Sequence, residues 1–120
     1  MANKGIKLSF LRELQQLFHK DAGELIELYV NNSKKKIAML YKAVEEDNLS
    51  NFKAAAQELR HRSLDIGAIQ FSYNCLALEM AAQEMCIERL PRLISLVESQ
   101  FGQMYKELEM IKGLSHRVPV

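Results

Sequence analysis

The sequence has few of the residues that interrupt helices or build special sites. It contains two prolines, five glycines, two cysteines and no tryptophan among 120 residues. No uninterrupted apolar run is long enough to predict a membrane-spanning helix. The first ten residues, MANKGIKLSF, lack the apolar core of a secretion signal, and a cytoplasmic location is therefore expected.

An excess of charge of one sign is also missing. Sixteen basic and fifteen acidic residues leave a formal net charge of +1, which gives no general attraction to nucleic acid or to an anionic membrane. The chain is long enough for one domain whose core needs neither metals nor disulfides. We therefore expect a single domain over residues 1–120, with frayed tails at 1–8 and 113–120.

The cysteines and histidines predict neither a disulfide nor a metal site. Cys75 and Cys86 are eleven residues apart, which on one helix separates them by roughly 16 Å. A disulfide needs a much shorter distance, so two free thiols in a reducing compartment are expected. His19, His61 and His116 show no metal-ligand spacing, and no cofactor is expected.

Helical periodicity dominates what the sequence does contain, because apolar residues recur at steps of three and four. Helices are expected at roughly 9–18, 22–46, from near 51 to Gly67, beyond Gly67, and from 90 onward, with Asp21 and Pro91 at helix starts. The predicted inward stripes are Ile26, Val30, Ser33, Ile37, Leu40 and Val44; Phe52, Ala55, Leu59, Ser63 and Ile66; Ala68, Phe71, Cys75, Leu78, Ala82 and Met85; and Leu90, Ile94, Val97, Phe101, Met104, Leu108 and Ile111.

Short connections between these segments favour antiparallel neighbours. The fold class predicted is therefore all-α, an antiparallel up-down four-helix bundle with a short extra N-terminal helix.

The helix that begins near residue 51 carries a polar outer face. If Ala55 and Leu59 point inward, Gln57 points almost the opposite way at about 100° per residue. One apolar residue on this side can mark a docking surface, although single exposed leucines are common. The residues expected on the outward side with Gln57 are Lys53, Arg60, His61, Leu64 and Ala68.

The stretch from Ala56 to Glu79 resembles the motif of histidine-containing phosphotransfer (HPt) domains. That motif runs Ala-His-x-Leu-Lys-Gly-Ser-Ser, then three free positions, Gly-Ala, and later Leu, Cys and Leu-Glu. The chain offers Ala56-Gln57-Glu58-Leu59-Arg60-His61-Arg62-Ser63, then Gly67-Ala68, and then Phe71, Cys75, Leu78 and Glu79 at the same offsets.

The segment LPRLISLVESQFGQMYKEL also looks like the last helix of the family, so the resemblance covers roughly residues 10–112. It implies a four-helix bundle in a two-component phosphorelay, with a response-regulator receiver domain or a histidine kinase as partner.

The departures from the motif lie where the chemistry of the family takes place. Gln57 occupies the position of the phosphoryl-accepting histidine, and its amide nitrogen offers no basic lone pair. Arg60 replaces a lysine and keeps a positive charge, while His61 and Arg62 replace a glycine and a serine. The positions that match the motif and are expected to serve the structure are Ser63, Gly67, Cys75 and Glu79, the last as a possible partner of a cation on a neighbouring helix.

Three interpretations follow. The preferred one is a monomeric, non-enzymatic HPt-like protein that binds a receiver domain or kinase without accepting phosphate, as an adaptor or competitor. The second makes His61 the acceptor, about 5–6 Å from Gln57, although a partner shaped for position 57 would be misaligned. The third is a plain helical-bundle interaction module. An independent enzyme is the weakest option, because no nucleophile–base pair or phosphate-binding glycine loop is present.

The lysine run at 34–36 is read as a solvated helix face or as a contact for an acidic partner.

Overall fold

The computed structural model describes the backbone of residues 22–117 and the side chains of residues 23–110. This part of the chain forms four α-helices, one short 3₁₀ helix and no strand. The elements are α2 (Ala22–Glu45), α3 (Leu49–Asp65), α4 (Ile69–Gln83), η1 (Ile87–Arg89) and α5 (Leu90–Arg117). The predicted all-α bundle is confirmed, whereas the expected helix at 9–18 and the cap at Asp21 lie outside the described residues. None of the described helices could span a membrane.

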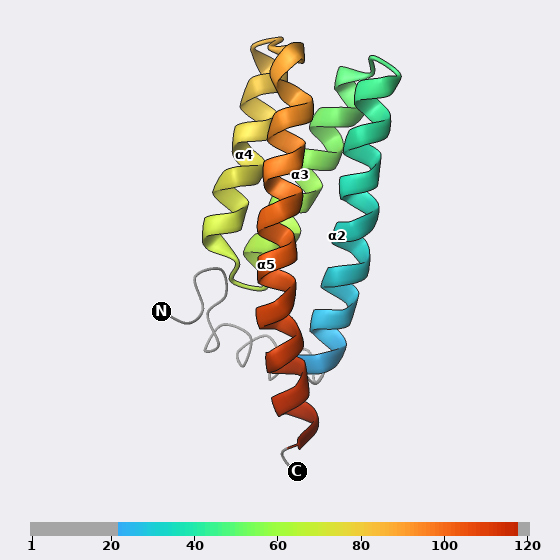
Figure 1. The fold of residues 1–120 in the computed structure, drawn as a ribbon. Coiled ribbons are helices and arrows are strands. Elements are labelled where there is room, and N and C mark those ends of the chain that lie inside the picture. Colours follow the sequence, from blue (N-terminus) through green and yellow to red (C-terminus); the bar gives the residue numbers. More distant parts are fainter. Residues whose placement is uncertain (1–21, 118–120) are drawn as a thin grey trace.

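The four helices pack side by side in an up-down order (Figure 1). Each helix contacts its neighbours along the chain, and α5 closes the bundle by packing against α2. The connections α2–α3 and α4–α5 therefore lie together at one end, and the α3–α4 turn lies toward the other (Figure 1). In this ring α3 lies between α2 and α4, so its outer face is bordered by both helices.

The core is built from the apolar stripes that the sequence predicts. Phe52, Leu59, Leu78, Ile94 and Leu108 are all completely buried. The prediction for Met85 is wrong, because this side chain is 69% exposed. Helix α4 ends at Gln83, so the helical step no longer applies two residues later. Ile111 lies beyond the described side chains, Val44 is half-buried, and the buried residues that the stripes missed include Tyr29, Ala43 and Ala56.

Helices α2, α3 and α4 end in the same kind of cap, in which a backbone N–H donates a hydrogen bond to the carbonyl of the residue five positions earlier. The residue before each donor has a positive φ, a conformation that glycine adopts without strain and a bulky side chain does not. Gly67 therefore suits its position at φ 80°, whereas Asp47 at 53° and Met85 at 59° occupy theirs with a side chain. The three bonds are Asn48 N–H to the Ala43 carbonyl (2.8 Å), Ala68 N–H to the Ser63 carbonyl (2.8 Å) and Cys86 N–H to the Ala81 carbonyl (3.0 Å).

The helix starts follow ordinary capping rules. The Asn48 side chain accepts a hydrogen bond from the Asn51 backbone N–H at 3.0 Å, so α3 begins at Leu49, two residues before the expected start. Pro91 lies in the first turn of α5, as predicted. At its other end α5 continues through Gly113 to Arg117, where a frayed tail was expected.

A buried polar contact fixes how α3 sits against α2. The Ser63 hydroxyl donates to the Leu59 carbonyl at 2.7 Å, which leaves the Tyr29 hydroxyl to donate to Ser63 Oγ at 2.8 Å. Burial raises the pKa of Tyr29, so the phenol stays neutral. The Tyr29 ring also packs against Phe101, which in turn packs against Phe71, with ring centroids 6.1 and 5.9 Å apart. These contacts involve all four helices and hold the inner face of α3 in place.

Candidate functional site

The outer face of α3 presents Lys53, Gln57, His61 and Leu64, and this set is called the α3 face below. All four side chains are exposed, with Leu64 at 40%. The predicted direction of Gln57 is therefore confirmed, since the inward residues of the same helix are buried. A polar surface with one apolar side chain is what the sequence predicts for this side of the bundle.

Gln57 and His61 lie one helical turn apart at the middle of the α3 face. At this spacing their β-carbons are about 5–6 Å from each other. Within the described part of the chain, neither side chain is held by a hydrogen bond or an ion pair. The amide of Gln57 and the imidazole of His61 are therefore both available for contact with a partner.

Arg60 lies at the α4 edge of this face and is bound to Glu79. Its Nη2 donates to Glu79 Oε1 at 3.1 Å, and its Nε donates to Oε2. This two-point contact raises the pKa of Arg60, and the two side chains are only 24% and 17% exposed. The suggested pairing of Glu79 with a cation on a neighbouring helix is thus confirmed. The positive charge of Arg60 is on the outward side but is already neutralised within the protein.

The α2 edge of the face is also closed by paired charges. Lys36 Nζ lies 2.7 Å from Glu58 Oε2, and Arg62 Nη2 lies 3.7 Å from Glu58 Oε1. The hydrogen bond from Lys36 lowers the pKa of Glu58. Sequence reasoning missed this network, because opposite charges on two helices meet only if the helices have the right register.

The lysine run divides over the surface of α2 instead of forming one patch. Lys36 is bound to Glu58, whereas the Lys34 ammonium lies over the Tyr105 ring of α5 at 4.9 Å from its centroid. Lys35 is exposed. Only part of the run therefore remains open to an acidic partner.

Lys53 and Ala68, the first and last residues of the predicted outer face, differ in exposure. Lys53 is exposed, and its Nζ donates to Gln83 Oε1 on α4 at 3.4 Å. The prediction that Ala68 points outward is wrong, because this residue is completely buried. Helix α3 ends at Asp65 and Gly67 turns the chain, so the angle of 100° per residue cannot be carried on to Ala68. Its place in the inward stripe of α4 is the correct one.

The remaining motif positions serve the structure. Ser63 is buried and hydrogen-bonded, and Gly67 provides the turn between α3 and α4. Cys75 is completely buried, and desolvation raises the pKa of its thiol to about 12, so it is not a thiolate nucleophile. Cys86 is half-buried and, like Cys75, forms no disulfide. Among the described residues, no cluster of three metal-ligating side chains occurs.

No family model matches the sequence, and no curated protein matches it. Histidine-containing phosphotransfer protein B from Pseudomonas aeruginosa has a similar structure, with a TM-score of 0.85 at 20% identity, over 93% of this chain and 97% of that one. The fold is that of the HPt proteins.

Two plant structures support the same conclusion. A proposed histidine-containing phosphotransfer protein from rice gives a TM-score of 0.84 at 16% identity, over 97% of this chain and 85% of that one. A histidine-containing phosphotransfer protein from maize gives 0.80 at 16% identity, over 94% of this chain and 93% of that one. The HPt bundle implied by the resemblance of residues 56–79 is therefore confirmed as a fold.

Proposed function

We propose that this chain is an HPt-like protein of a two-component phosphorelay that binds a receiver domain or a histidine kinase without accepting a phosphoryl group. One observation carries the proposal: Gln57 is exposed at the middle of the α3 face, at the motif position where HPt domains have their acceptor histidine. The fold shared with three HPt structures supports it. The protein would act as an adaptor or as a competitor of active phosphotransfer proteins.

The chemistry of the Gln57 amide explains how this chain can bind a partner and yet accept no phosphoryl group. A phosphoryl acceptor needs a lone pair that can attack phosphorus, as an imidazole nitrogen has. The amide nitrogen of Gln57 is delocalised into its carbonyl, but its two N–H groups can still donate hydrogen bonds to a carboxylate. Gln57 can therefore meet the acceptor aspartate of a receiver domain while no bond to phosphorus forms.

His61 is proposed as a contact residue. Its imidazole is exposed, so a role as phosphoryl acceptor can be tested directly. In-line transfer requires reacting atoms about 3–3.5 Å apart. A partner aligned on residue 57 places phosphorus about one helical turn away from His61. The imidazole also occupies the space that the glycine of the family motif leaves empty.

A binding experiment with matched variants tests the docking part of the proposal. The purified chain would be titrated calorimetrically with receiver domains and histidine kinases of the source organism. Leu64→Asp should weaken binding to the true partner by about tenfold or more, because it puts a charge into the contact. Leu96→Asp is the control, since Leu96 is a similarly exposed leucine on α5, at 52%. Absence of any binding partner, or equal loss in both variants, would reject docking through the α3 face.

A competition experiment tests the consequence for signalling. Transfer between a phosphorylated receiver and an active HPt protein should slow as this chain is added. The Leu64→Asp variant should compete less well and the Leu96→Asp variant as well as the unmodified chain. A bundle that is only an interaction module with no phosphorelay partner would leave the transfer rate unchanged.

A further inference from the structure

The α2–α3 and α4–α5 connections come together at one end of the bundle (Figure 1). Residues at this end line a crevice. Its volume is about 320 Å³. The bundle consists of two helical hairpins, α2–α3 and α4–α5, and both contribute walls to the crevice. Helices α2 and α3 supply one side, and the segment from η1 to α5 supplies the other. The lining includes Val44, Asp47, Leu49, Phe52, Ile87 and Leu90.

The crevice is apolar except for one carboxylate. Phe52 and Leu90 are 0% and 1% exposed, so they form a closed floor, whereas Ile87 is 42% exposed and lies at the rim. Pockets for small molecules typically measure about 300–1,000 Å³, with mostly apolar walls and a few polar groups that fix the orientation of the ligand. This crevice has that composition at the lower end of that size range.

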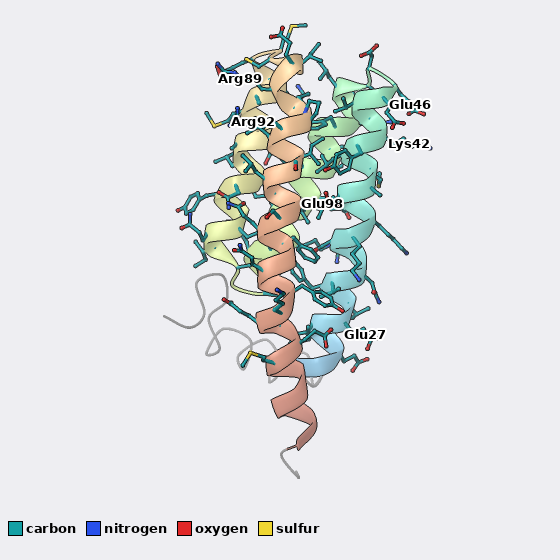
Figure 2. The ribbon with its side chains drawn as sticks, viewed as in Figure 1. Glu27, Lys42, Glu46, Arg89, Arg92 and Glu98 are labelled. Carbon is teal, nitrogen blue, oxygen red and sulfur yellow. The ribbon has the colours of Figure 1, made fainter. Side chains whose placement is uncertain are left out.

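Asp47 is the charged group at this crevice. It occupies the positive-φ position of the α2 cap, and its side chain is exposed. Lys42, Arg89 and Arg92 are exposed at the same end of the bundle (Figure 2). In the described part of the chain, none of these cations forms an ion pair with Asp47. An apolar crevice beside an uncompensated carboxylate favours a cation over an anion, since a matched charge offsets part of the cost of desolvation.

We propose that this crevice binds a small organic cation, an aryl- or alkylammonium. The apolar body of the ligand lies against Val44, Leu49 and Ile87, and its ammonium group pairs with the Asp47 carboxylate. Because the ligand contacts both hairpins, its binding stabilises the bundle by mass action. The site does not depend on the proposed function, since Phe52 is on the inner side of α3 and the α3 face is on the outer side.

An NMR titration with three isosteric probes tests the chemical class of the ligand. The probes are 2-phenylethylammonium, 2-phenylethanol and 3-phenylpropionate, which share an arylethyl body and differ in charge. The ammonium compound should give saturable shifts at the backbone amides of Asp47, Leu49 and Ile87. Affinity should fall about fivefold for the alcohol and further for the carboxylate. Equal affinity for cation and anion, or shifts that never saturate, would overturn the proposal.

A pair of neighbouring substitutions tests the role of the carboxylate. Asp47→Asn removes the charge but keeps a residue that tolerates positive φ, so the turn should remain intact. It should lower the affinity for 2-phenylethylammonium about fivefold and leave the affinity for 2-phenylethanol unchanged. Glu46→Gln is the matched control, because Glu46 is the preceding exposed carboxylate and does not line the crevice. This substitution should change neither affinity. An ammonium affinity insensitive to Asp47→Asn contradicts the assignment. A lysine-containing peptide that shifts these amides when the free amine does not would assign the crevice to a protein partner instead.

Discussion

Helix α3 has two faces that differ in what they contribute to the protein. The inner face, with Phe52, Ala55 and Leu59, is buried to 2% exposure or less and packs in the core of the bundle. The outer face presents Gln57 and His61, which no other described side chain holds in place. The inner face keeps the pattern of the HPt motif, whereas the outer face departs from it. Under the proposed function, the fold and the phosphoryl chemistry depend on opposite sides of one helix, so one can change without the other.

The largest expected difference between the two faces is in stability. Leu59→Ala should lower the free energy of unfolding by about 2–5 kcal/mol, because it removes a completely buried side chain and leaves a cavity. Gln57→Ala should change it by less than about 0.5 kcal/mol, because this side chain is exposed. Urea denaturation of both variants measures the difference. Similar losses from the two substitutions would show that the outer face also holds the fold.

A smaller effect is expected from the buried hydroxyl beneath α3. Tyr29→Phe removes the hydrogen bond to Ser63 and should cost about 1 kcal/mol of stability, while the ring packing stays. Partner affinity measured by calorimetry should stay within a factor of about two, because the change lies on the inner side. A large loss of affinity at unchanged stability would show that the inner face also takes part in partner binding.

Substitution of Arg60, at the edge between the two faces of α3, should change mainly the stability of the protein. Arg60→Met removes the two-point contact with Glu79 and should cost about 1 kcal/mol of stability, because the Glu79 carboxylate loses its partner but stays within reach of water at 17% exposure. Partner affinity should change by less than about threefold, because the Glu79 charge that remains lies at the α4 edge of the α3 face, where solvent and salt screen it. Denaturation and calorimetry on the same variant separate the two quantities. A loss of affinity of tenfold or more would make Arg60 a partner contact.

The smallest effect is a dependence of stability on pH at the α2 edge. Lys36 lowers the folded-state pKa of Glu58, so this pair stabilises the protein above the unfolded pKa of Glu58 and loses that contribution as the pH falls through the lowered value. Lys36→Met should therefore cost less than about 1 kcal/mol at neutral pH and almost nothing in strong acid. Denaturation midpoints of both chains across the acid range measure this. A difference that grows on acidification has the wrong sign for this pairing.

The sequence predicts the inner face well because helical periodicity is a local property. Leu59 and Gln57 are two residues apart on one helix, and their opposite directions follow from helix geometry alone. The same argument fails at Ala68 and Met85, since each follows a helix end at which a positive φ redirects the chain. These two errors have one cause, which is that the spacing of residues was extended past the last residue of a helix.

Contacts between helices were the harder part to predict. The charges of Lys36, Glu58 and Arg60 are evident in the sequence, but their partners depend on how α2, α3 and α4 are aligned along the bundle. Tyr29 was missed because a tyrosine is often exposed, and its buried partner Ser63 is thirty-four positions away. The electrostatics at the edges of the α3 face therefore required the structure, whereas the exposure of Gln57 did not.

The proposed function is tested most directly by asking whether a phosphoryl group reaches this chain. A radiolabelled phosphorylated receiver or kinase would be incubated with the unmodified chain, with Gln57→His, and with His61→Ala, and label would be measured on each. No label is expected on the unmodified chain or on His61→Ala, even where calorimetry shows binding. Acid-labile label on the unmodified chain that disappears in His61→Ala would contradict it, because the outer face would then carry a working acceptor.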